Sequence, residues 1–473
     1  MTVWILLAGL FQVLGIVSTI HVLMTGRTSQ GTIAWGVSLN TFPLLAVPAY
    51  WILGRSKFEG YVTAKRMIGS DFEKEYKGLI DRLSNYRIPA EELPAGLKAG
   101  ELLADLPLLT GNHIELLING EKTFESILSG IELAEHYILF QFFIVHDDEI
   151  GRRIGKALAE KAQQGLTVYF LYDEIGSHDL PAGYLSNLKN AGVAVHAFNT
   201  RKGPRNRFQI NFRNHRKVVV ADGKTAWVGG HNVGDEYLGK HPKFGNWRDT
   251  HIRITGPAAL SAQLSFCTDW HWASDDPLLH LNWKPEPAAE ADIPALLVPS
   301  GPADELEAAS LMFLQAINSA TKRIWIQSPY FVPDDAIISA LQLAALRGVD
   351  VRILIPDSID HLAVWLCAFS YFDRATETGA RIYRYTRGFL HAKTILVDDK
   401  IAAVGTANLD NRSLRLNFEI TAWIFDSAFA AEMEAMYLTD FEDSRLMTAD
   451  DLDCRPWWFK LAVRFARLTA PIQ

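Results

Sequence analysis

The stretch Phe389-Leu-His-Ala-Lys-Thr-Ile-Leu-Val-Asp398 has a histidine, a lysine two residues later and an aspartate five residues after that lysine. The same pattern occurs earlier, in Asn214-His-Arg-Lys-Val-Val-Val-Ala-Asp222. In both places an asparagine follows the histidine by 17 residues (232 − 215 and 408 − 391), within a Gly-x-x-Asn. Two matches with equal spacing indicate two copies of one structural unit, and they disfavour the alternative of two unrelated core hairpins.

Each motif places a histidine and a lysine on one face of a strand. The apolar runs 218–220 and 393–397 are typical of strands, and residues two apart on a strand point to the same face. His215 therefore shares a face with Lys217, and His391 with Lys393. An ammonium holds anionic oxygens while an imidazole attacks phosphorus or moves a proton, so this pairing suits a phosphate.

Each motif ends at a turn between two apolar runs, since Asp222 precedes Gly223 and Asp398 precedes Asp399. The pattern predicts a β-hairpin in each half. We interpret both motif aspartates as turn residues first, and keep them in the catalytic set only as weak candidates for direct chemistry.

The returning strands lead to Asn232 and Asn408, and the nearby glycines let the backbone approach a ligand closely. We expect these two amides to bind substrate phosphate. A nucleophilic imidazole also needs a carboxylate to hold its tautomer. The candidates are Asp249 for His215 and Glu419 for His391.

The doubled motif and its flanks, Gly229-Gly-His-Asn-Val-Gly-Asp-Glu-Tyr237 and 405–419, resemble the bacterial cardiolipin synthase branch of the phospholipase D superfamily, over nearly the whole chain. The resemblance implies two tandem α/β halves that meet face to face and form one site. It also implies that one histidine attacks the phosphodiester, forming a phosphohistidine, while the other acts as acid and base. Family habit makes His215 the nucleophile and His391 the acid/base, which the residues alone leave open.

The same resemblance implies transfer between two phosphatidylglycerol molecules, yielding cardiolipin and glycerol, with no metal and no other cofactor. The two lysines and two asparagines would hold the phosphoryl oxygens. A near-isoenergetic diester exchange needs no nucleotide, and the sequence has no P-loop.

Composition excludes some classes of protein. A net charge of −8 over 473 residues argues against a general nucleic-acid binder. The cysteines at 267, 367 and 454 have neither the pattern of a disulfide framework nor that of a zinc site.

Two long uncharged runs, Val3–Met24 and 32–54, predict a transmembrane hairpin in residues 1–56. A cleaved signal peptide is the alternative; it fits poorly, because the first run lacks a basic leader and a second run follows. We expect Pro43 and Pro48 to kink the second helix. We also expect polar residues within the runs to pair across the hairpin; these are Gln12, His21 and Asn40.

Basic residues follow the second run, whereas the loop between the runs has only Arg27. By the positive-inside rule, the large C-terminal part faces the cytoplasm. With the family resemblance, this predicts a multi-pass protein of the bacterial inner membrane whose partners are membrane phospholipids. Residues 57–110 are predicted to form a juxtamembrane linker, with a helix over 70–86.

Strands alternate with helices twice in the same order, which predicts an α/β sandwich in each half. Gln141 and Gln327 fall at corresponding places in the repeat. We assign the first half to 111–285 and the second to 286–473, beginning with a Pro-rich linker over 285–295.

Two basic segments each leave a choice open. One precedes and enters the first motif and either attracts anionic headgroups or is a solvated loop; it holds Arg201, Lys202, Arg205, Arg207, Arg213, Arg216 and Lys217. The other is 455–468, basic and aromatic, which lies either in the membrane interface or against the catalytic halves.

Other functions remain as alternatives. A hydrolytic phospholipase D uses the same residues with water as acceptor, and other transphosphatidylases use serine or ethanolamine. A nuclease of the superfamily fits poorly with two apolar runs and an acidic balance. A non-catalytic membrane scaffold is a further alternative, disfavoured by two intact motifs.

Overall fold

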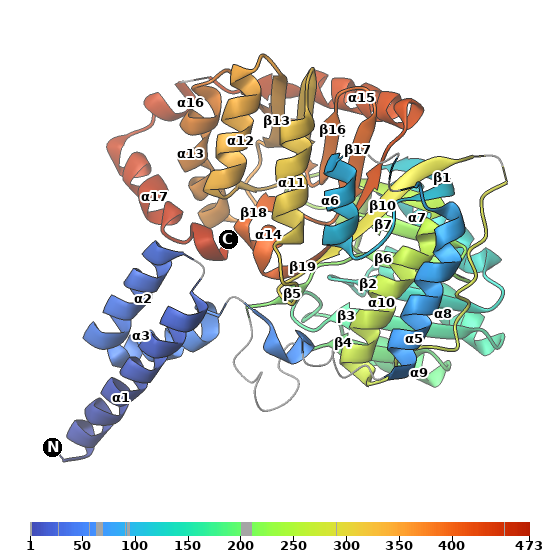
Figure 1. Cartoon of the computed structure of the whole chain (residues 1–473), viewed down its shortest axis with the longest axis horizontal. Coiled ribbons are helices and arrows are strands. Elements are labelled where there is room, and N and C mark those ends of the chain that lie inside the picture. The colour runs from blue at the N-terminus through green and yellow to red at the C-terminus, as the bar shows by residue number, and fades with distance from the viewer. Residues whose placement is uncertain are drawn as a thin grey trace.

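A computed structural model describes residues 2–26, 28–55, 57–62, 70–89, 91, 95–199, 211–289, 291–448 and 450–473. Figure 1 shows a body of two α/β halves, from which the N-terminal helices project. The first half comprises β1 (Leu109–Ile118), α7 (Asn119–Leu133), β2 (Tyr137–Phe142), α8 (Glu149–Gln163), β3 (Thr167–Asp173), α9 (Ala182–Asn190), β4 (Ala194–Phe198), β6 (Val218–Ala221), β7 (Thr225–Gly229), β9 (Thr250–Thr255) and α10 (Ala258–Ser274).

The second half repeats these elements in the same order. It comprises β10 (Ile293–Ser300), α11 (Ala308–Ser319), β11 (Arg323–Gln327), α12 (Asp335–Leu346), β13 (Asp350–Pro356), α13 (Leu362–Thr376), β14 (Arg381–Tyr385), β16 (Thr394–Val397), β17 (Ile401–Gly405), β19 (Asn417–Ile424), α15 (Ser427–Glu442) and β20 (Ser444–Leu446).

The two halves share one continuous sheet that is joined where β1 pairs antiparallel with β10. Outward from this seam the strand order is β1-β9-β7-β6-β2-β3-β4 on one side and β10-β19-β17-β16-β11-β13-β14 on the other. Each of these strands thus has its counterpart at the same place in the opposite half, and β20 adds one further strand beyond β14. The predicted duplication and mixed α/β fold are confirmed.

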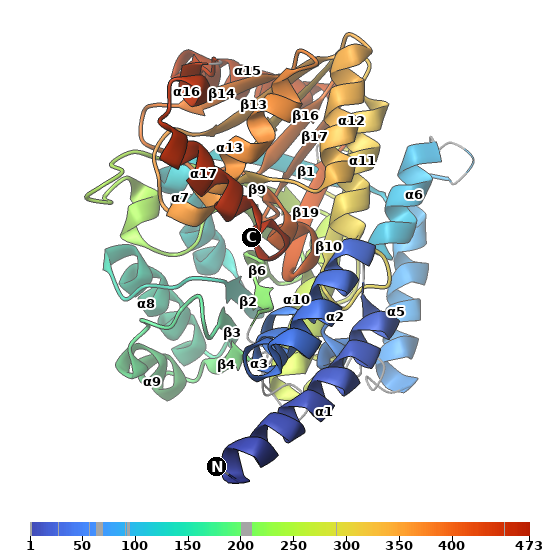
Figure 2. The same ribbon diagram turned by 90° about the vertical axis from the view of Figure 1, so that its left-hand side faces the viewer.

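The central strands are buried on both faces, which explains their continuous apolar runs. Every residue of β2, β6 and β16 is buried. Helices cover both sides of the sheet, as the two perpendicular views show (Figures 1 and 2). This packing holds the strands that carry the motifs rigidly in place.

Hairpins join β6 to β7 and β16 to β17, as the motif turns predicted. Asp222 and Asp398 occupy the left-handed region at the turns, with φ of 56° and 50°. Asp tolerates this conformation better than most residues because its short side chain bonds locally.

The N-terminal region comprises α1 (Thr2–Thr25), α2 (Ser29–Thr41) and α3 (Pro43–Leu53). Within the described residues, α1 is the one helix long and apolar enough to cross a bilayer. The expected second spanning helix is instead two short helices that meet at Phe42. Proline lacks an N–H and its ring clashes with the preceding turn, so α2 ends before Pro43 rather than bending through it.

Polar residues pair between α1 and the following helices, as predicted. Asn40 Nδ2 donates to Thr19 Oγ1 at 2.8 Å, and Gln12 Nε2 reaches the Asn40 carbonyl at 3.5 Å. His21 Nδ1 lies 2.6 Å from the Tyr50 hydroxyl. These contacts hold α1 against both short helices.

Residues 57–110 were expected to be a linker, but described residues of this range contribute to the core. The predicted helix over 70–86 is α5 (Ser70–Leu83), continued by the 3₁₀ turn η1 (Ser84–Tyr86). Leu79 and Leu83 of α5 are buried in the core cluster that contains side chains of both halves, and α6 (Ala95–Ala104) packs on β10. Apolar positions repeating at helical spacing decide this, since a helix with a buried face must pack against another element.

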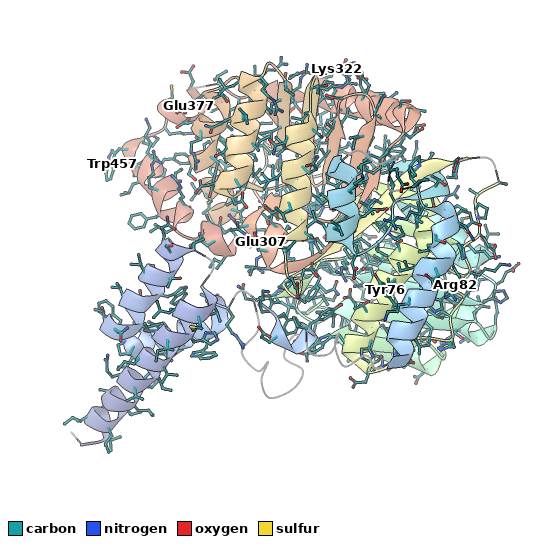
Figure 3. All side chains as sticks on the ribbon, viewed as in Figure 1. Tyr76, Arg82, Glu307, Lys322, Glu377 and Trp457 are labelled. Atoms are coloured by element: carbon teal, nitrogen blue, oxygen red, sulfur yellow. The ribbon has the colours of Figure 1, made fainter. Side chains whose placement is uncertain are left out.

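The C-terminal helix α17 (Trp457–Arg467) has two distinct faces. Phe459 and Val463 are buried against the body, where α17 packs on α13. The opposite face is open: Trp457 is 76% exposed and Phe465 63%, and Figure 3 shows Trp457 at the edge of the molecule. Of the two alternatives for this segment, packing against the catalytic halves is therefore correct for one face of α17.

Short elements complete the fold. These are β5 (Arg213–Asn214), η3 (Asp235–Leu238), β8 (Trp247–Arg248), β12 (Phe331–Val332), β15 (Phe389–Leu390), β18 (Leu409–Asp410), α14 (Asn411–Arg415), α16 (Asp450–Asp453) and η4 (Ala470–Ile472).

Candidate active site

Two short parallel pairings cross between the halves beside the motif histidines. The strand β5, just before His215, pairs with β19 of the second half, and β15, just before His391, pairs with β8 of the first half. The ladder continues into each histidine: His215 N donates to the Phe418 carbonyl at 2.9 Å, and His391 N to the Arg248 carbonyl at 2.8 Å. Each histidine is thus held in register beside the residue that follows, Glu419 or Asp249.

The carboxylates bind the histidines in the crossed sense. His215 Nδ1 lies 2.8 Å from Glu419 Oε2, and His391 Nδ1 lies 2.7 Å from Asp249 Oδ2. The expected pairing within each half is therefore wrong, although both carboxylates were correctly predicted to contact a motif histidine. The physical reason is that β19 and β8 lie beside the opposite motif, which no spacing along the chain reveals.

The imidazole rings of His215 and His391 each have one nitrogen in a hydrogen bond and one without a partner among the described residues. Each imidazole uses Nδ1 for its carboxylate, and Nε2 has no hydrogen-bond partner among the described residues. A buried carboxylate accepting from Nδ1–H keeps the lone pair on Nε2, the form needed for attack or proton transfer. Both rings are nearly buried.

Charges from both motifs act on each histidine, which indicates one shared site. The pKa of His215 is lowered to about 4, chiefly by burial and also by Lys217 and Lys393, against the opposing effect of Glu419. Burial and the same two lysines place the pKa of His391 well below its ordinary value. Both rings are therefore neutral at pH 7 before a substrate anion arrives.

Glu419 remains ionised beside His215. Burial acts to raise the pKa of Glu419, but His215 and Lys217 outweigh burial and hold this pKa below its ordinary value. Asn417 Nδ2 also donates to Glu419 Oε1 at 3.1 Å. The carboxylate is thus fixed in place as an acceptor for the imidazole.

The motif lysines have no carboxylate within ion-pairing distance among the described residues. Lys217 Nζ donates to the carbonyl of His215 at 2.7 Å, and Lys393 Nζ donates to that of His391. Burial lowers the pKa of Lys393 to about 8 and that of Lys217 well below its ordinary value. Two buried ammonium groups without a counter-ion make a strong site for an anion, which would raise both pKa values on binding.

The two asparagines are buried but differ in their contacts. Asn232 Nδ2 donates to the Tyr237 hydroxyl at 2.8 Å, and its Oδ1 accepts from the backbone of Ile144. Asn408 Oδ1 has no partner among the described residues, while its side chain bonds to Asp410. The matched spacing therefore gives matched positions without identical hydrogen bonds.

The motif aspartates bind backbone at the far end of their strands from the histidines. Asp222 accepts from the N–H groups of residues 135–137, and Asp398 from those of residues 321–323. This supports their interpretation as turn residues. We therefore remove both aspartates from the catalytic candidates. Each side chain already accepts hydrogen bonds from the backbone at the start of the neighbouring strand, β2 or β11.

A buried carboxylate backs each motif, and the sequence reading missed both. Asp269 pairs with Arg216 at 2.9 Å within the first half, whereas Asp440 of the second half pairs with Arg248 of the first half at 2.7 Å. Asp269 follows Asp249 by 20 residues and Asp440 follows Glu419 by 21 (269 − 249 and 440 − 419), a near-match that could have found them.

The glutamines noticed in the repeat belong to these groups. Gln141 Nε2 donates to Asp269 Oδ2 at 2.7 Å, and Gln327 Nε2 to Asp440 Oδ2 at 2.6 Å. Equivalent donors on β2 and β11 thus reach equivalent carboxylates on α10 and α15.

The basic cluster before the first motif divides into two parts. Arg201, Lys202, Arg205 and Arg207 lie outside the described residues. Arg216 is buried in its ion pair with Asp269, so it serves the fold rather than a solvent-facing patch. The described residues contain no group of three or more His, Cys, Asp or Glu side chains that could hold a metal ion.

Comparison with known proteins shows the family of the chain. A family model described as the cardiolipin synthase, phospholipase D-like domain matches residues 127–243 and 313–440. Cardiolipin synthase A of Pseudomonas putida is 46% identical over 475 residues, covering 98% of this chain and 97% of that protein. Cardiolipin synthase A of Pseudomonas fluorescens SBW25 is 47% identical over 468 residues, covering 97% and 96%.

A solved structure shares the fold. Phosphatidylserine synthase of Haemophilus influenzae Rd KW20 aligns with a TM-score of 0.60 at 17% identity, covering 80% of this chain and 100% of that one. This likeness shows the architecture alone, whereas the family match and the near-half identity extend over the motifs. The chain therefore belongs to the bacterial cardiolipin synthases of the phospholipase D superfamily, which are phosphatidyltransferases.

Proposed function

We propose that the protein transfers the phosphatidyl group of one phosphatidylglycerol to a hydroxyl of a second, producing cardiolipin and glycerol. The observation that carries the proposal is the crossed pair of histidine–carboxylate hydrogen bonds, His215–Glu419 and His391–Asp249. Two oriented imidazoles beside two buried lysines are the groups that a two-step phosphodiester exchange needs.

In the first step, Nε2 of His215 attacks the phosphorus of the donor lipid. A P–N bond forms, the bond between phosphorus and the glycerol oxygen breaks, and protonated His391 gives its proton to that oxygen. Glycerol leaves, and the phosphatidyl group stays on His215. The anionic diester offsets the charges of Lys217 and Lys393, which raises the pKa of His391 and lets it carry the proton.

In the second step, His391 takes the proton from a hydroxyl of the incoming phosphatidylglycerol. The oxygen attacks phosphorus, the P–N bond breaks, and cardiolipin forms while His215 returns to its neutral form. Lys217 and Lys393 hold the phosphoryl oxygens as charge shifts in both transition states. Asn232 and Asn408 lie at matched positions, and their Nδ2 groups are the atoms that would donate to the phosphoryl oxygens.

The test of the reaction is lipid analysis by mass spectrometry. Purified protein in detergent–phosphatidylglycerol micelles with a chelator should yield cardiolipin and free glycerol, and His391→Ala should abolish both. Phosphatidic acid as the sole product would replace the synthase with a hydrolase. No turnover by folded protein would favour a scaffold or another acceptor.

The order of the two histidines is tested separately. A phosphatidyl-enzyme should accumulate in His391→Ala and be absent from His215→Ala, since only the former retains the nucleophile. Trapping in the opposite variant would reverse the two roles.

We also propose that the N-terminal helices embed in the bacterial inner membrane, with α1 as one crossing and the short helices α2 and α3 together as the second, and that the catalytic body faces the cytoplasm. The apolar α1 supports membrane insertion, and Arg55 just after α3 supports the orientation. Cys454 is exposed, whereas Cys267 and Cys367 are buried. A membrane-impermeant maleimide should therefore label inverted vesicles and spare intact spheroplasts.

A further inference from the structure

The segment that follows the N-terminal helices inserts between the two catalytic halves. Phe58 and Tyr61 are buried, and Phe58 N donates to the Pro302 carbonyl of the second half at 3.1 Å. The Phe58 ring stacks on Phe212 of the first half with centroids 5.3 Å apart, and it meets Trp272 edge-on at 5.1 Å. This short segment thus joins the membrane-directed helices to both halves of the body.

Tyr61 makes the polar contact of this segment. Its hydroxyl donates to Asp269 Oδ1 at 2.7 Å, and its ring lies 4.6 Å from that of Phe418. Burial and the adjacent Asp269 raise the pKa of Tyr61 well above its ordinary value, so the phenol stays protonated and remains a donor. Phe418 directly precedes Glu419 and accepts from the backbone of His215.

Asp269 connects Tyr61 to the histidine–carboxylate pair. The same carboxylate accepts from Arg216 Nη1 at 2.9 Å and from Asn214 Nδ2 at 2.8 Å. Arg216 Nε in turn donates to the carbonyl of Glu419 at 3.0 Å. The residues on either side of His215 and the backbone of its carboxylate partner therefore depend on where Asp269 is held.

The second half has no equivalent of Tyr61. Asp440 accepts from Arg248 and Gln327, but within the described ranges no tyrosine donates to it. Among the described residues, the N-terminal segment therefore contacts one of the two buried carboxylates, the one behind His215.

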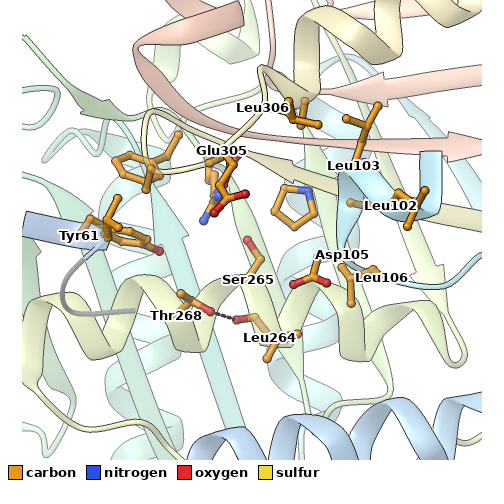
Figure 4. A pocket seen from close by; sticks show the side chains of 18 of the residues that line it. Tyr61, Leu102, Leu103, Asp105, Leu106, Leu264, Ser265, Thr268, Glu305 and Leu306 are labelled. Carbon is orange, nitrogen blue, oxygen red and sulfur yellow. Dashed lines mark hydrogen bonds between the residues drawn. The ribbon is translucent and has the colours of Figure 1, made fainter. Parts of the chain in front are cut away.

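A cavity lies beside the hydrogen bond between the Tyr61 hydroxyl and Asp269. Tyr61, Arg216 and Phe418 line a cavity of about 660 Å³ between α10, the end of α6 and the loop before α11 (Figure 4). Side chains that face a cavity are not confined by packing on that side, because close packing is what holds core side chains in one rotamer. Packing holds the Tyr61 ring, and on the cavity side hydrogen bonds set the positions of its hydroxyl and of the Arg216 guanidinium.

We propose that Tyr61 is a positioning residue for the reaction: its hydrogen bond to Asp269 holds Arg216 and thereby aligns Glu419 with His215. Since α3 ends just before this segment, the same contact makes the alignment depend on the seating of the N-terminal helices. The inference rests on the proposed role of His215 in phosphatidyl transfer.

The experiment compares Tyr61→Phe with Tyr76→Phe in the full-length protein. Tyr76 is the matched control, because it lines the same cavity and donates its hydroxyl to the Asp105 carbonyl at 2.6 Å, away from Asp269. Cardiolipin formation is measured against phosphatidylglycerol concentration and pH, with wild-type turnover established first.

Tyr61→Phe should lower kcat about tenfold, the order expected when a hydrogen bond to a charged group is lost from the transition state. KM should stay within about twofold, since no substrate contact is removed. The acid limb of the kcat profile should move to lower pH by about half a unit, because a poorly aligned Glu419 raises the pKa of His215 less. Tyr76→Phe should match the wild type.

A second variant separates positioning from packing. Phe58→Leu loosens the same segment but leaves the Tyr61 hydroxyl, so it should lower the melting temperature without moving the acid limb. A Tyr61→Phe enzyme with wild-type kcat and an unmoved acid limb would overturn the proposal. So would a fall in kcat that merely follows the folded fraction. Absent turnover in the wild type would instead count against the proposed function.

Discussion

Glu419 of the second half lies 2.8 Å from Nδ1 of His215 of the first half. In the opposite sense, Asp249 of the first half lies 2.7 Å from Nδ1 of His391 of the second half. Neither half thus contains a complete histidine–carboxylate pair. The parallel pairings of β5 with β19 and of β15 with β8 produce this exchange, because each brings one motif beside the other half's acidic strand.

Removing the Glu419 charge should disable turnover while the fold persists. We expect Glu419→Gln to lower kcat by about 10²- to 10⁴-fold, because an amide no longer stabilises the imidazolium or holds the reactive tautomer of His215. Glu442→Gln, at an exposed position of α15, is the control and should keep wild-type turnover. Turnover is followed as cardiolipin formed per folded protein. If Glu419→Gln loses activity and its melting temperature falls as well, the result would indicate a structural role for Glu419.

The buried histidines should make the protein sensitive to mild acid. The pKa of His215 is about 4 in the folded protein and about 6.5 when unfolded. The unfolded chain therefore binds the proton first, and stability is present above pH 6.5 and is lost as the pH falls toward 4. We expect about 2 kcal/mol of unfolding free energy to disappear from this group between pH 7 and pH 5.

Denaturant unfolding in detergent at the two pH values measures this loss. His215→Gln, which does not titrate, should show a smaller loss than the wild type. An equal pH dependence in both proteins would contradict the assignment.

The motif aspartates should matter for stability rather than chemistry. Asp222 accepts three backbone N–H bonds at its turn, and an asparagine tolerates the positive φ but offers one acceptor oxygen. We expect Asp222→Asn to cost about 1–3 kcal/mol of unfolding free energy with kcat per folded molecule within about threefold of wild type. Melting curves measure the loss of stability, and specific activity per folded molecule measures any loss of turnover. A stable but inactive variant would restore a direct catalytic role.

The open face of α17 should lie in the membrane interface. Its exposed aromatic residues stand beside basic ones, among them Lys460 and Arg464, and the helix contains no acidic residue. Such a face suits an anionic bilayer surface. A nitroxide at Leu461→Cys, in a Cys454→Ser background in phosphatidylglycerol-containing vesicles, should be accessible to oxygen and shielded from a water-soluble nickel complex.

The exposed turn residue Glu377, just beyond α13 (Figure 3), provides the matched control. A label at Glu377→Cys should be open to the nickel complex. Equal nickel accessibility at the two positions would exclude an interfacial α17.

Much of the fold follows from local patterns. The apolar runs of β6 and β16, each followed by an aspartate turn, predicted two hairpins. The structure has both, since β6 pairs antiparallel with β7 and β16 with β17. The segment 57–110 was misjudged because its polar composition conceals the apolar stripe of α5 that includes Leu79 and Leu83. The second apolar run was misjudged because Pro43 does more than bend a helix: α2 ends before it.

The sequence by itself determined that the chain is a duplicated α/β protein, and it named the histidines, lysines and carboxylates that are the candidates for its site. Residue identity and spacing carry that information, since equal intervals place equal side chains on equal strands. Only the tertiary structure decided which carboxylate contacts which histidine, that Arg216 pairs with Asp269 and Arg248 with Asp440, and that Tyr61 donates to Asp269. Such contacts join residues up to 208 positions apart, and they depend on how the strands of two halves pair across space, which periodicity along one chain does not encode.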